Sequence, residues 1–222
     1  MKKPLAFDPH AGIDLHVHST ASDGTLTPAE ILTMAVQRGL KAIAITDHDT
    51  LSGSAAAIAG GLPAALQFVT GVEISAAAPE GHAVKGSVHL LGYGIDLFNP
   101  TLTALVSQLN AARQRRNPQI LARLAALGMH LDMDELAGLV GGATPGRPHI
   151  AQLMISKKMA TSIDDAFDRF LGKTGAAYVE KARVPMTEAI AAIKAAGGVA
   201  VLAHPHLNGL TDPDQFERFL LT

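Results

Sequence analysis

Short apolar segments of strand length alternate with helical segments along this chain, and that alternation limits its fold more than any other feature. Residues 12–17 (GIDLHV) and 41–46 (KAIAIT) have the length and apolar character of strands, and residues 199–203 form another all-apolar run. Strands that alternate with helices predict a parallel sheet, and all-apolar strands predict one that is covered on both faces or closed into a barrel. We therefore predict an α/β fold.

The segment between the first two strands carries a helix start signal. Thr27 can act as the N-cap, Pro28 suits the first helical position, and Glu30 completes a capping box. Two further strand candidates, residues 68–75 and 88–94, follow and are separated by turns that contain glycine and proline. The order strand, helix, strand is therefore expected at the amino-terminal end.

From Pro100 onward the apolar pattern becomes helical. We expect helices at Leu102–Arg116, Ile120–Leu127, Met133–Val140, His149–Lys158 and Ile163–Leu171, with breaks at Gly128, Gly141-Gly142 and Gly172. Pro185 then opens a helix that ends near Ala196, and the strand at residues 199–203 resumes the earlier alternation. We divide the chain into three parts: a core in residues 1–99, an inserted helical subdomain in residues 100–182, and the continuation of the core in residues 183–222.

The composition of the 222 residues excludes several classes of protein. With 48% hydrophobic and 17% charged residues, the chain matches ordinary globular proteins rather than disordered ones. No segment approaches the ~18 continuous apolar residues of a membrane helix, and the start lacks a signal-peptide apolar run, so we expect a cytoplasmic location and no membrane partner. A net charge of −2 means that a polyanion would have to meet a local basic cluster. The absence of cysteine excludes disulfides and thiolate metal sites.

His16 and His18 form the clearest chemical motif. Residues two apart in a strand point to the same side, so both imidazoles can reach one metal ion. Taken alone, the short pair fits a solvated strand face equally well. Further residues of ligand type stand at or shortly after the strand candidates: Asp23, Asp47, His48, Asp49, Glu73, His89 and His204. Because functional groups collect at the carboxyl ends of strands in α/β sheets and barrels, this convergence predicts a metal site.

The donors in this set are nitrogen and oxygen atoms, which suit manganese, zinc, iron or magnesium and exclude a purely soft-metal site. A second, basic cluster lies in the helical segment: Arg113, Arg115, Arg116, Arg123 and Arg147. The planar guanidinium group matches phosphate oxygens in a bidentate way. A solvated helix face suits Arg115 and Arg123 better, whereas Arg147 stands in a rigid Gly-Arg-Pro turn. We select Arg116 and Arg147 as phosphate contacts.

Six segments resemble, in order, the motifs of the PHP (polymerase and histidinol phosphatase) superfamily: DLHVHSTASDG, ITDHDTLSG, GVEIS, HLLGY, GRPHIA and GGVAVLAHP. The similarity is closest to the nucleoside-bisphosphatase and oligonucleotide exonuclease branch. The resemblance implies a distorted (β/α)7 TIM-like barrel with a helical insert. It also implies three divalent cations, with manganese expected first, and hydrolysis of phosphomonoesters by a metal-bridged hydroxide.

The resemblance also implies residue roles. The metal ligands would be His16, His18 and Glu73 for the first ion, Glu73, His89 and His149 for the second, and Asp23 and His48 for the third. His204 would lie by the substrate phosphate or leaving group, and Arg116 and Arg147 would clamp phosphate, so that His204 and Arg147 are the catalytic candidates.

The family pattern continues with a strand bearing a Gly-Ser-Asp-Phe-His-like motif, whose Asp and His would complete the first and third metal sites. No such motif occurs before Thr222. Without the insert roughly 140 residues remain, too few to close a barrel whose usual size is ~250 residues. We therefore expect a chain that is incomplete at its carboxyl end and that is weakly active or inactive alone, compared with an extended one.

The activity that the resemblance implies is removal of the 3′-phosphate from nucleoside 3′,5′-bisphosphates, and also trimming of 5′-phosphorylated oligonucleotides. The binding partner would be a phosphorylated nucleotide or short oligonucleotide, with no stable protein partner evident. Histidinol phosphate phosphatase is one alternative. A non-catalytic metal-binding module is another, but loss of ligands would be its signature, and the seven ligands expected within this length are all present.

Overall fold

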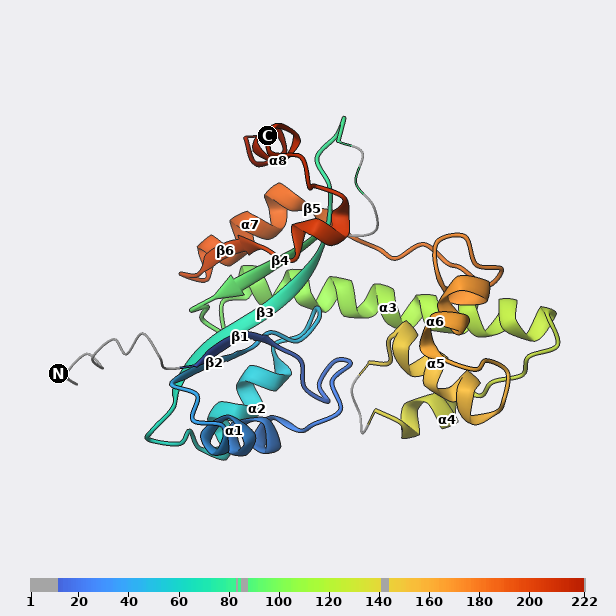
Figure 1. The fold of residues 1–222 in the computed structure, drawn as a ribbon, viewed down its shortest axis with the longest axis horizontal. Coiled ribbons are helices and arrows are strands. Elements are labelled where there is room, and N and C mark those ends of the chain that lie inside the picture. The colour runs from blue at the N-terminus through green and yellow to red at the C-terminus, as the bar shows by residue number, and fades with distance from the viewer. Residues whose placement is uncertain (1–11, 83, 85–87, 141–143, 222) are drawn as a thin grey trace.

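The computed structural model describes residues 12–82, 84, 88–140 and 144–221. These residues form a six-stranded sheet in which the order is β1-β2-β3-β4-β6 and β5 pairs with β3 outside that path (Figure 1). The strands are β1 (Ile13–Val17), β2 (Ala42–Ile45), β3 (Gln67–Ala77), β4 (Val88–Tyr93), β5 (Val184–Pro185) and β6 (Val199–Leu202). The predicted α/β class is confirmed.

Helices pack against the sheet. The α-helices are α1 (Pro28–Gln37), α2 (Ser52–Gly60), α3 (Pro100–Ala126), α4 (Met133–Gly138), α5 (Arg147–Ser156), α6 (Ile163–Ala166), α7 (Met186–Ala195) and α8 (Pro213–Leu220), joined by a π-helix (Phe167–Leu171) and a 3-10 helix (Pro205–Asn208). One core cluster joins α1 and α2 to β2, and another joins α3, α7 and α8 to β3 and β4. The predicted capping box of α1 is confirmed, since the Thr27 and Glu30 side chains each accept from the other's backbone N–H. No helix in the described part of the chain is long and apolar enough to cross a membrane.

The prediction of a parallel sheet is correct for β1, β2 and β3 but wrong for β4. Strand β4 runs antiparallel to both of its neighbours, β3 and β6. The reason is the length of the connection between β3 and β4, residues 78–87, which is shorter than the dozen or more residues that a parallel crossover needs. The sheet is therefore mixed.

The predicted barrel is not observed, because the sheet is open among the described residues, with β1 and β6 at the ends of the pairing order. The all-apolar sequence of β6 predicted burial on both faces. Instead, Val199 and Val201 are 64% and 40% exposed, so only one face of this edge strand is covered.

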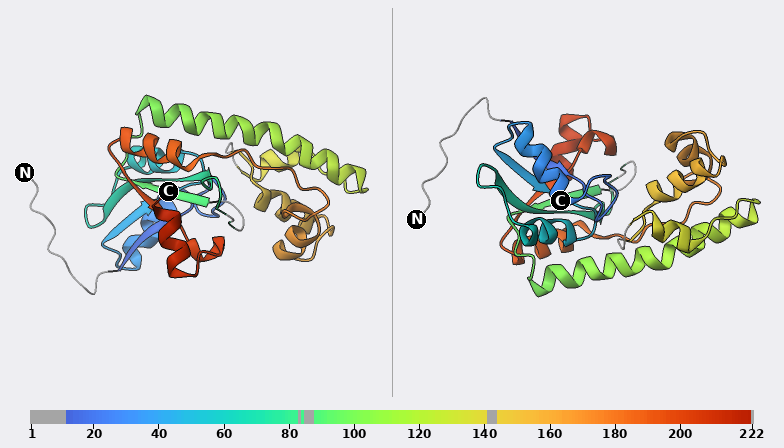
Figure 2. Two further views of the ribbon diagram at one scale, coloured as in Figure 1. Left: turned by 90° about the horizontal axis from the view of Figure 1, so that it is seen from above. Right: turned by 90° about the horizontal axis from the view of Figure 1, so that it is seen from below.

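Helix α3 links the sheet to the helical segment as one continuous rod (Figure 2). Two separate helices were predicted here, yet α3 continues through Pro118. An interior proline costs about 3 kcal/mol of helix stability, but α3 is packed on both sides of it. Leu102 and Leu109 join the sheet core, whereas Ile120 and Leu124 join a second core built from residues 120–177. The break predicted at Gly141-Gly142 lies outside the described residues.

Candidate metal centre

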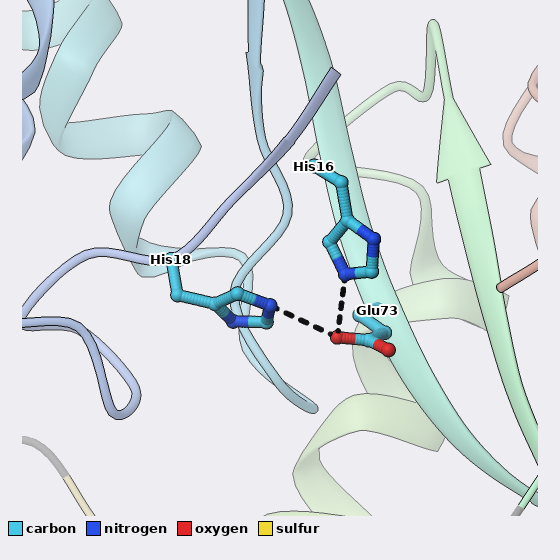
Figure 3. A group of neighbouring side chains, drawn as sticks. All are labelled: His16, His18 and Glu73. Carbon is cyan, nitrogen blue, oxygen red and sulfur yellow. Dashed lines mark hydrogen bonds and ion pairs between the residues drawn. The ribbon is translucent and has the colours of Figure 1, made fainter. Parts of the chain in front are cut away.

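The carboxylate of Glu73, on β3, is fully buried and forms the centre of a histidine cluster. Figure 3 shows His16, in β1, and His18, the residue directly after β1, converging on one carboxylate oxygen. The Nε2 atoms of these two rings each lie 3.1 Å from Glu73 Oε2, and Nδ1 of His48 lies 3.2 Å from the same oxygen. Three imidazoles therefore share a single oxygen atom.

The other oxygen of Glu73 has two further histidine contacts. His89 Nδ1 and His204 Nε2 each lie 2.9 Å from Oε1. The backbone of His204 has φ +31° and ψ 57°, a left-handed conformation that is uncommon for a residue other than glycine. Such a conformation is typical of functional sites, where surrounding structure holds it in place. Five histidine rings thus surround one carboxylate.

The prediction that these residues all lie at the carboxyl ends of strands is wrong for His89, because β4 runs antiparallel to β3. His16, His18 and His48 lie at or after the carboxyl ends of β1 and β2, and His204 follows β6. His89, in contrast, lies at the beginning of β4, opposite Ser75 of β3. Because β4 is antiparallel, its amino-terminal end reaches the edge where the other strands end.

Asp23 adds a second carboxylate on the far side of two of these rings. His18 Nδ1 lies 3.5 Å from Asp23 Oδ1, and His48 Nε2 lies 3.8 Å from Asp23 Oδ2. Both rings therefore face Glu73 with one nitrogen and Asp23 with the other. The cluster contains three groups of residues, and within each group the donor atoms all lie within 4.8 Å of one another. The groups are His16, His18 and Glu73; His18, Asp23 and His48; and His48, Glu73 and His89.

The protonation of Glu73 and of His48 suits metal binding. Burial alone would raise the pKa of the Glu73 carboxyl, but hydrogen bonds with His16, His18 and His89 outweigh it and hold that pKa well below its usual range. Burial lowers the pKa of His48 to about 4, so its imidazole is neutral at pH 7, the form that ligates metals. Its Nδ1 atom is buried without a hydrogen bond in the described part of the chain. The donor set therefore fits divalent cations.

Asp47, directly before His48, fixes the loop that carries Asp23. Its buried carboxylate accepts hydrogen bonds from the Ser19 backbone N–H (2.7 Å), the Ser19 hydroxyl (2.7 Å) and the Ser22 hydroxyl (2.6 Å). Gly53 of α2 lies so close that a Cβ atom there would be 1.8 Å from Asp47 Oδ2. The sequence predicts a position for Asp47 near the site, but it does not predict the hydrogen bonds from Ser19 and Ser22.

We expect Asp47→Ala to lower the free energy of unfolding by about 3 kcal/mol, because hydrogen bonds to a charged group contribute about 1.5–3 kcal/mol each and their donors would stay buried. Urea unfolding measures this effect. Asp168→Ala is the matched control, since Asp168 is exposed and surface substitutions typically change stability by less than about 0.5 kcal/mol. Equal losses in the two variants would contradict the role of Asp47.

Asp49, on the other side of His48, connects the histidine cluster to α3. Its carboxylate accepts from the Ser75 backbone N–H at 2.7 Å and from Arg113 Nη2 at 2.6 Å. Its own backbone N–H donates to Glu73 O at 2.9 Å, and its φ is +54°. This role of Arg113 could not be predicted from the sequence, because its partner Asp49 lies 64 residues away in the chain.

A cavity of about 330 Å³ opens beside the histidines, and its wall includes His48, His89 and His204. Arg113, Arg116 and Arg147 also line it. The structure therefore brings the two selected arginines, Arg116 and Arg147, to the same cavity as three of the histidines.

The two selected arginines differ in their partners. Arg116 is 5% exposed, and its Nε and Nη1 atoms have no hydrogen-bond partner among the described residues. Burial, together with the neighbouring Arg147 and Arg113, lowers its pKa to about 10. Arg147 donates to Leu171 O at 2.9 Å, and its guanidinium carbon lies 5.5 Å from the centre of the Phe167 ring.

His149 is the one predicted ligand that joins none of the three donor groups found in the described residues. It lies in the first turn of α5, where its Nδ1 atom accepts from the Gly146 backbone N–H at 3.0 Å. Burial is the main cause that lowers its pKa.

The model of the PHP domain family matches residues 14–183. The chain is 35% identical over 192 residues to a 5′-3′ exoribonuclease of Haemophilus influenzae, with 86% of this chain and 68% of that protein covered. It is 34% identical over 205 residues to a 3′,5′-nucleoside bisphosphate phosphatase of Chromobacterium violaceum, with 88% and 67% covered. The chain thus spans about two thirds of the length of these relatives. The crystal structure of a candidate metal-dependent phosphoesterase from Bifidobacterium adolescentis aligns with a TM-score of 0.83 and 32% identity, over 96% of this chain and 75% of that one.

Proposed function

The chain belongs to the PHP domain family, and from that membership we propose that it removes the 3′-phosphate of nucleoside 3′,5′-bisphosphates at a divalent-metal centre. It is a hydrolase that acts on phosphoric ester bonds. One observation carries the choice of substrate: the cavity that shares His48, His89 and His204 with the metal centre is lined by three arginines. A substrate with two phosphates needs anion contacts away from the metals as well as at them.

We assign the metals to three positions, with manganese as the ion expected first. The proposed ligands are His16, His18 and Glu73; Glu73, His89 and His149; and Asp23 and His48. The donor groups around Glu73 and Asp23 support these assignments, apart from His149. Bound divalent cations lower the pKa of a coordinated water and neutralise charge as the P–O bond breaks. Glu73 and Asp23 orient the imidazoles, and the buried position of Glu73 excludes water from its side of the centre.

The remaining residues act on the substrate. We propose that Arg116 and Arg147 bind phosphate oxygens and that His204 lies by the reacting phosphate or the leaving group. His204 Nδ1 is buried and makes no hydrogen bond in the described part of the chain, which supports a role for the ring toward a ligand. Residues 100–182 would then form a substrate-binding lobe, and the separate core of residues 120–177 supports that division.

A substrate panel tests this proposal. We expect adenosine 3′,5′-bisphosphate to be hydrolysed with a kcat/KM at least ~10-fold above that of histidinol phosphate, because histidinol phosphate offers no second phosphate to the arginines. A short 5′-phosphorylated RNA should be a second substrate. Released phosphate and released mononucleotides are the measured products. A preference for histidinol phosphate would overturn the assignment.

A non-catalytic metal-binding module is the alternative from another class. It predicts that the chain binds divalent metal but hydrolyses no member of the panel. Elemental analysis of the same purified sample separates this outcome from simple loss of metal, because a metal-loaded but inactive protein would favour the module.

A further inference from the structure

Lys181 is a cation at this site that the proposed mechanism does not use. It lies in the segment between the π-helix and β5, and its side chain is 15% exposed. The ammonium nitrogen lies 3.1 Å from Asp49 Oδ2 and donates a hydrogen bond to the Ser75 hydroxyl. The Ser75 hydroxyl in turn donates to Asp49 Oδ2 at 2.9 Å. Two side chains therefore fix the position of the ammonium group.

These contacts place Lys181 between the histidine cluster and the arginines. Ser75 is paired with His89 across β3 and β4, and Asp49 directly follows His48. Lys181 also lines the 330 Å³ cavity, together with Arg116. The ammonium group is thus next to the proposed metal ligands and next to the proposed phosphate contacts.

The charge balance around the cavity favours a missing anion over a structural ion pair. Asp49 is already paired with Arg113 at 2.6 Å, so one carboxylate serves two cations. The cavity wall carries four cationic side chains, Arg113, Arg116, Arg147 and Lys181, and one carboxylate, Asp23. Two further carboxylates contact wall residues: Asp49 pairs with Arg113 and Lys181, and Glu73 contacts His48, His89 and His204. Four cations therefore face three carboxylates. An excess of buried positive charge is costly unless an anion joins it. Burial lowers the pKa of Lys181 to about 8, although Asp49 acts in the opposite direction, so the ammonium form still predominates at pH 7.

We propose that Lys181 binds a phosphate oxygen of the substrate at the boundary between the metal centre and the arginines. An ammonium group carries three hydrogens, and Asp49 and Ser75 accept two of them among the described residues. The third is available to an anion in the cavity. Because the long side chain is already held in place, little conformational freedom is lost when phosphate binds. The identity of the anion as a phosphate ester rests on the proposed function.

Phosphate protection tests the contact in the unaltered, metal-loaded chain. Reductive methylation with formaldehyde and a hydride donor modifies lysine amines, and peptide mass spectrometry gives the rate at each lysine. We expect inorganic phosphate to slow methylation of Lys181 by ~5-fold or more, while Lys173, which is exposed on the same segment, keeps its rate. An unchanged rate at Lys181 in saturating phosphate would overturn the proposal.

Substitution gives the second test. Lys181→Met keeps most of the apolar stem and removes the charge, so the Kd for inorganic phosphate, measured by calorimetry on metal-loaded protein, should rise by about 10-fold or more, as expected for one hydrogen bond between charged groups. Lys173→Met should stay within ~2-fold of the parent. A Kd for Lys181→Met within that same range contradicts the contact. If Lys181→Met does not fold, the protection experiment on the parent decides.

The two proposals can fail separately. Phosphate binding that depends on Lys181, in a chain that hydrolyses no phosphate ester, would refute the proposed function and leave the phosphate contact standing. If the parent hydrolyses the bisphosphate but Lys181→Met binds phosphate with unchanged affinity, the phosphate contact of Lys181 is refuted and the proposed function stands.

Discussion

Glu73→Gln should lower kcat/KM for the bisphosphate by well over 100-fold. Changes to residues that only support metal ligands typically cost about 10- to 100-fold in metal affinity or activity, and Glu73 is a direct contact of five histidine rings. An amide retains the size of the side chain but offers one oxygen instead of two and carries no charge. Phosphate release and metal content per chain should therefore fall together.

The control for this substitution is Glu80→Gln, because Glu80 is an exposed glutamate that follows the same strand. We expect Glu80→Gln to retain the activity and metal content of the parent. Far-UV circular dichroism should show that both variants are folded. Activity of Glu73→Gln within ~10-fold of the parent would mean that the carboxylate does not bridge metals, and the proposed centre would be wrong.

The parts of this site that the sequence predicts are the ones set by local rules. Strand alternation places the rings of His16 and His18 on one side, and a capping box places the start of α1. Glu73 is likewise predicted at the functional edge, but the prediction that it lies near the end of its strand is wrong, because β3 continues to Ala77 and leaves Glu73 near its middle. These features depend on neighbours within a few residues.

The parts that the sequence does not predict depend on long-range packing. The direction of β4 is decided by a short connection, and α3 passes through Pro118 because two cores hold it on either side. The contact of Lys181 with Ser75 joins residues 106 positions apart. Periodicity within a window of residues carries no information about such pairs, so the charged wall of the cavity becomes visible only in three dimensions.

Arg116→Met should weaken activity and at the same time stabilise the protein. The Arg116 guanidinium is buried, and two of its nitrogens lack hydrogen-bond partners among the described residues, so it imposes a cost on the free chain. A buried donor without a partner costs about 1–3 kcal/mol. Methionine fills similar space without charge, and for a chain of this length each 1 kcal/mol raises the Tm by about 2–4 °C. We therefore expect a higher Tm together with a kcat/KM lower by about 10- to 100-fold, the effect of one hydrogen bond to a charged phosphate.

Arg115→Met provides the matched control, because Arg115 is the preceding residue of α3 and is exposed. It should change neither the Tm nor kcat/KM beyond small surface effects. The rise in Tm and the fall in kcat/KM expected for Arg116→Met distinguish a structural arginine from one that binds substrate. A structural arginine would lose stability on substitution and leave kcat/KM unchanged, whereas an arginine that awaits an anion gains stability and loses substrate. Saturating inorganic phosphate should, for the same reason, raise the Tm of the parent more than that of Arg116→Met, since only the parent gains the missing partner.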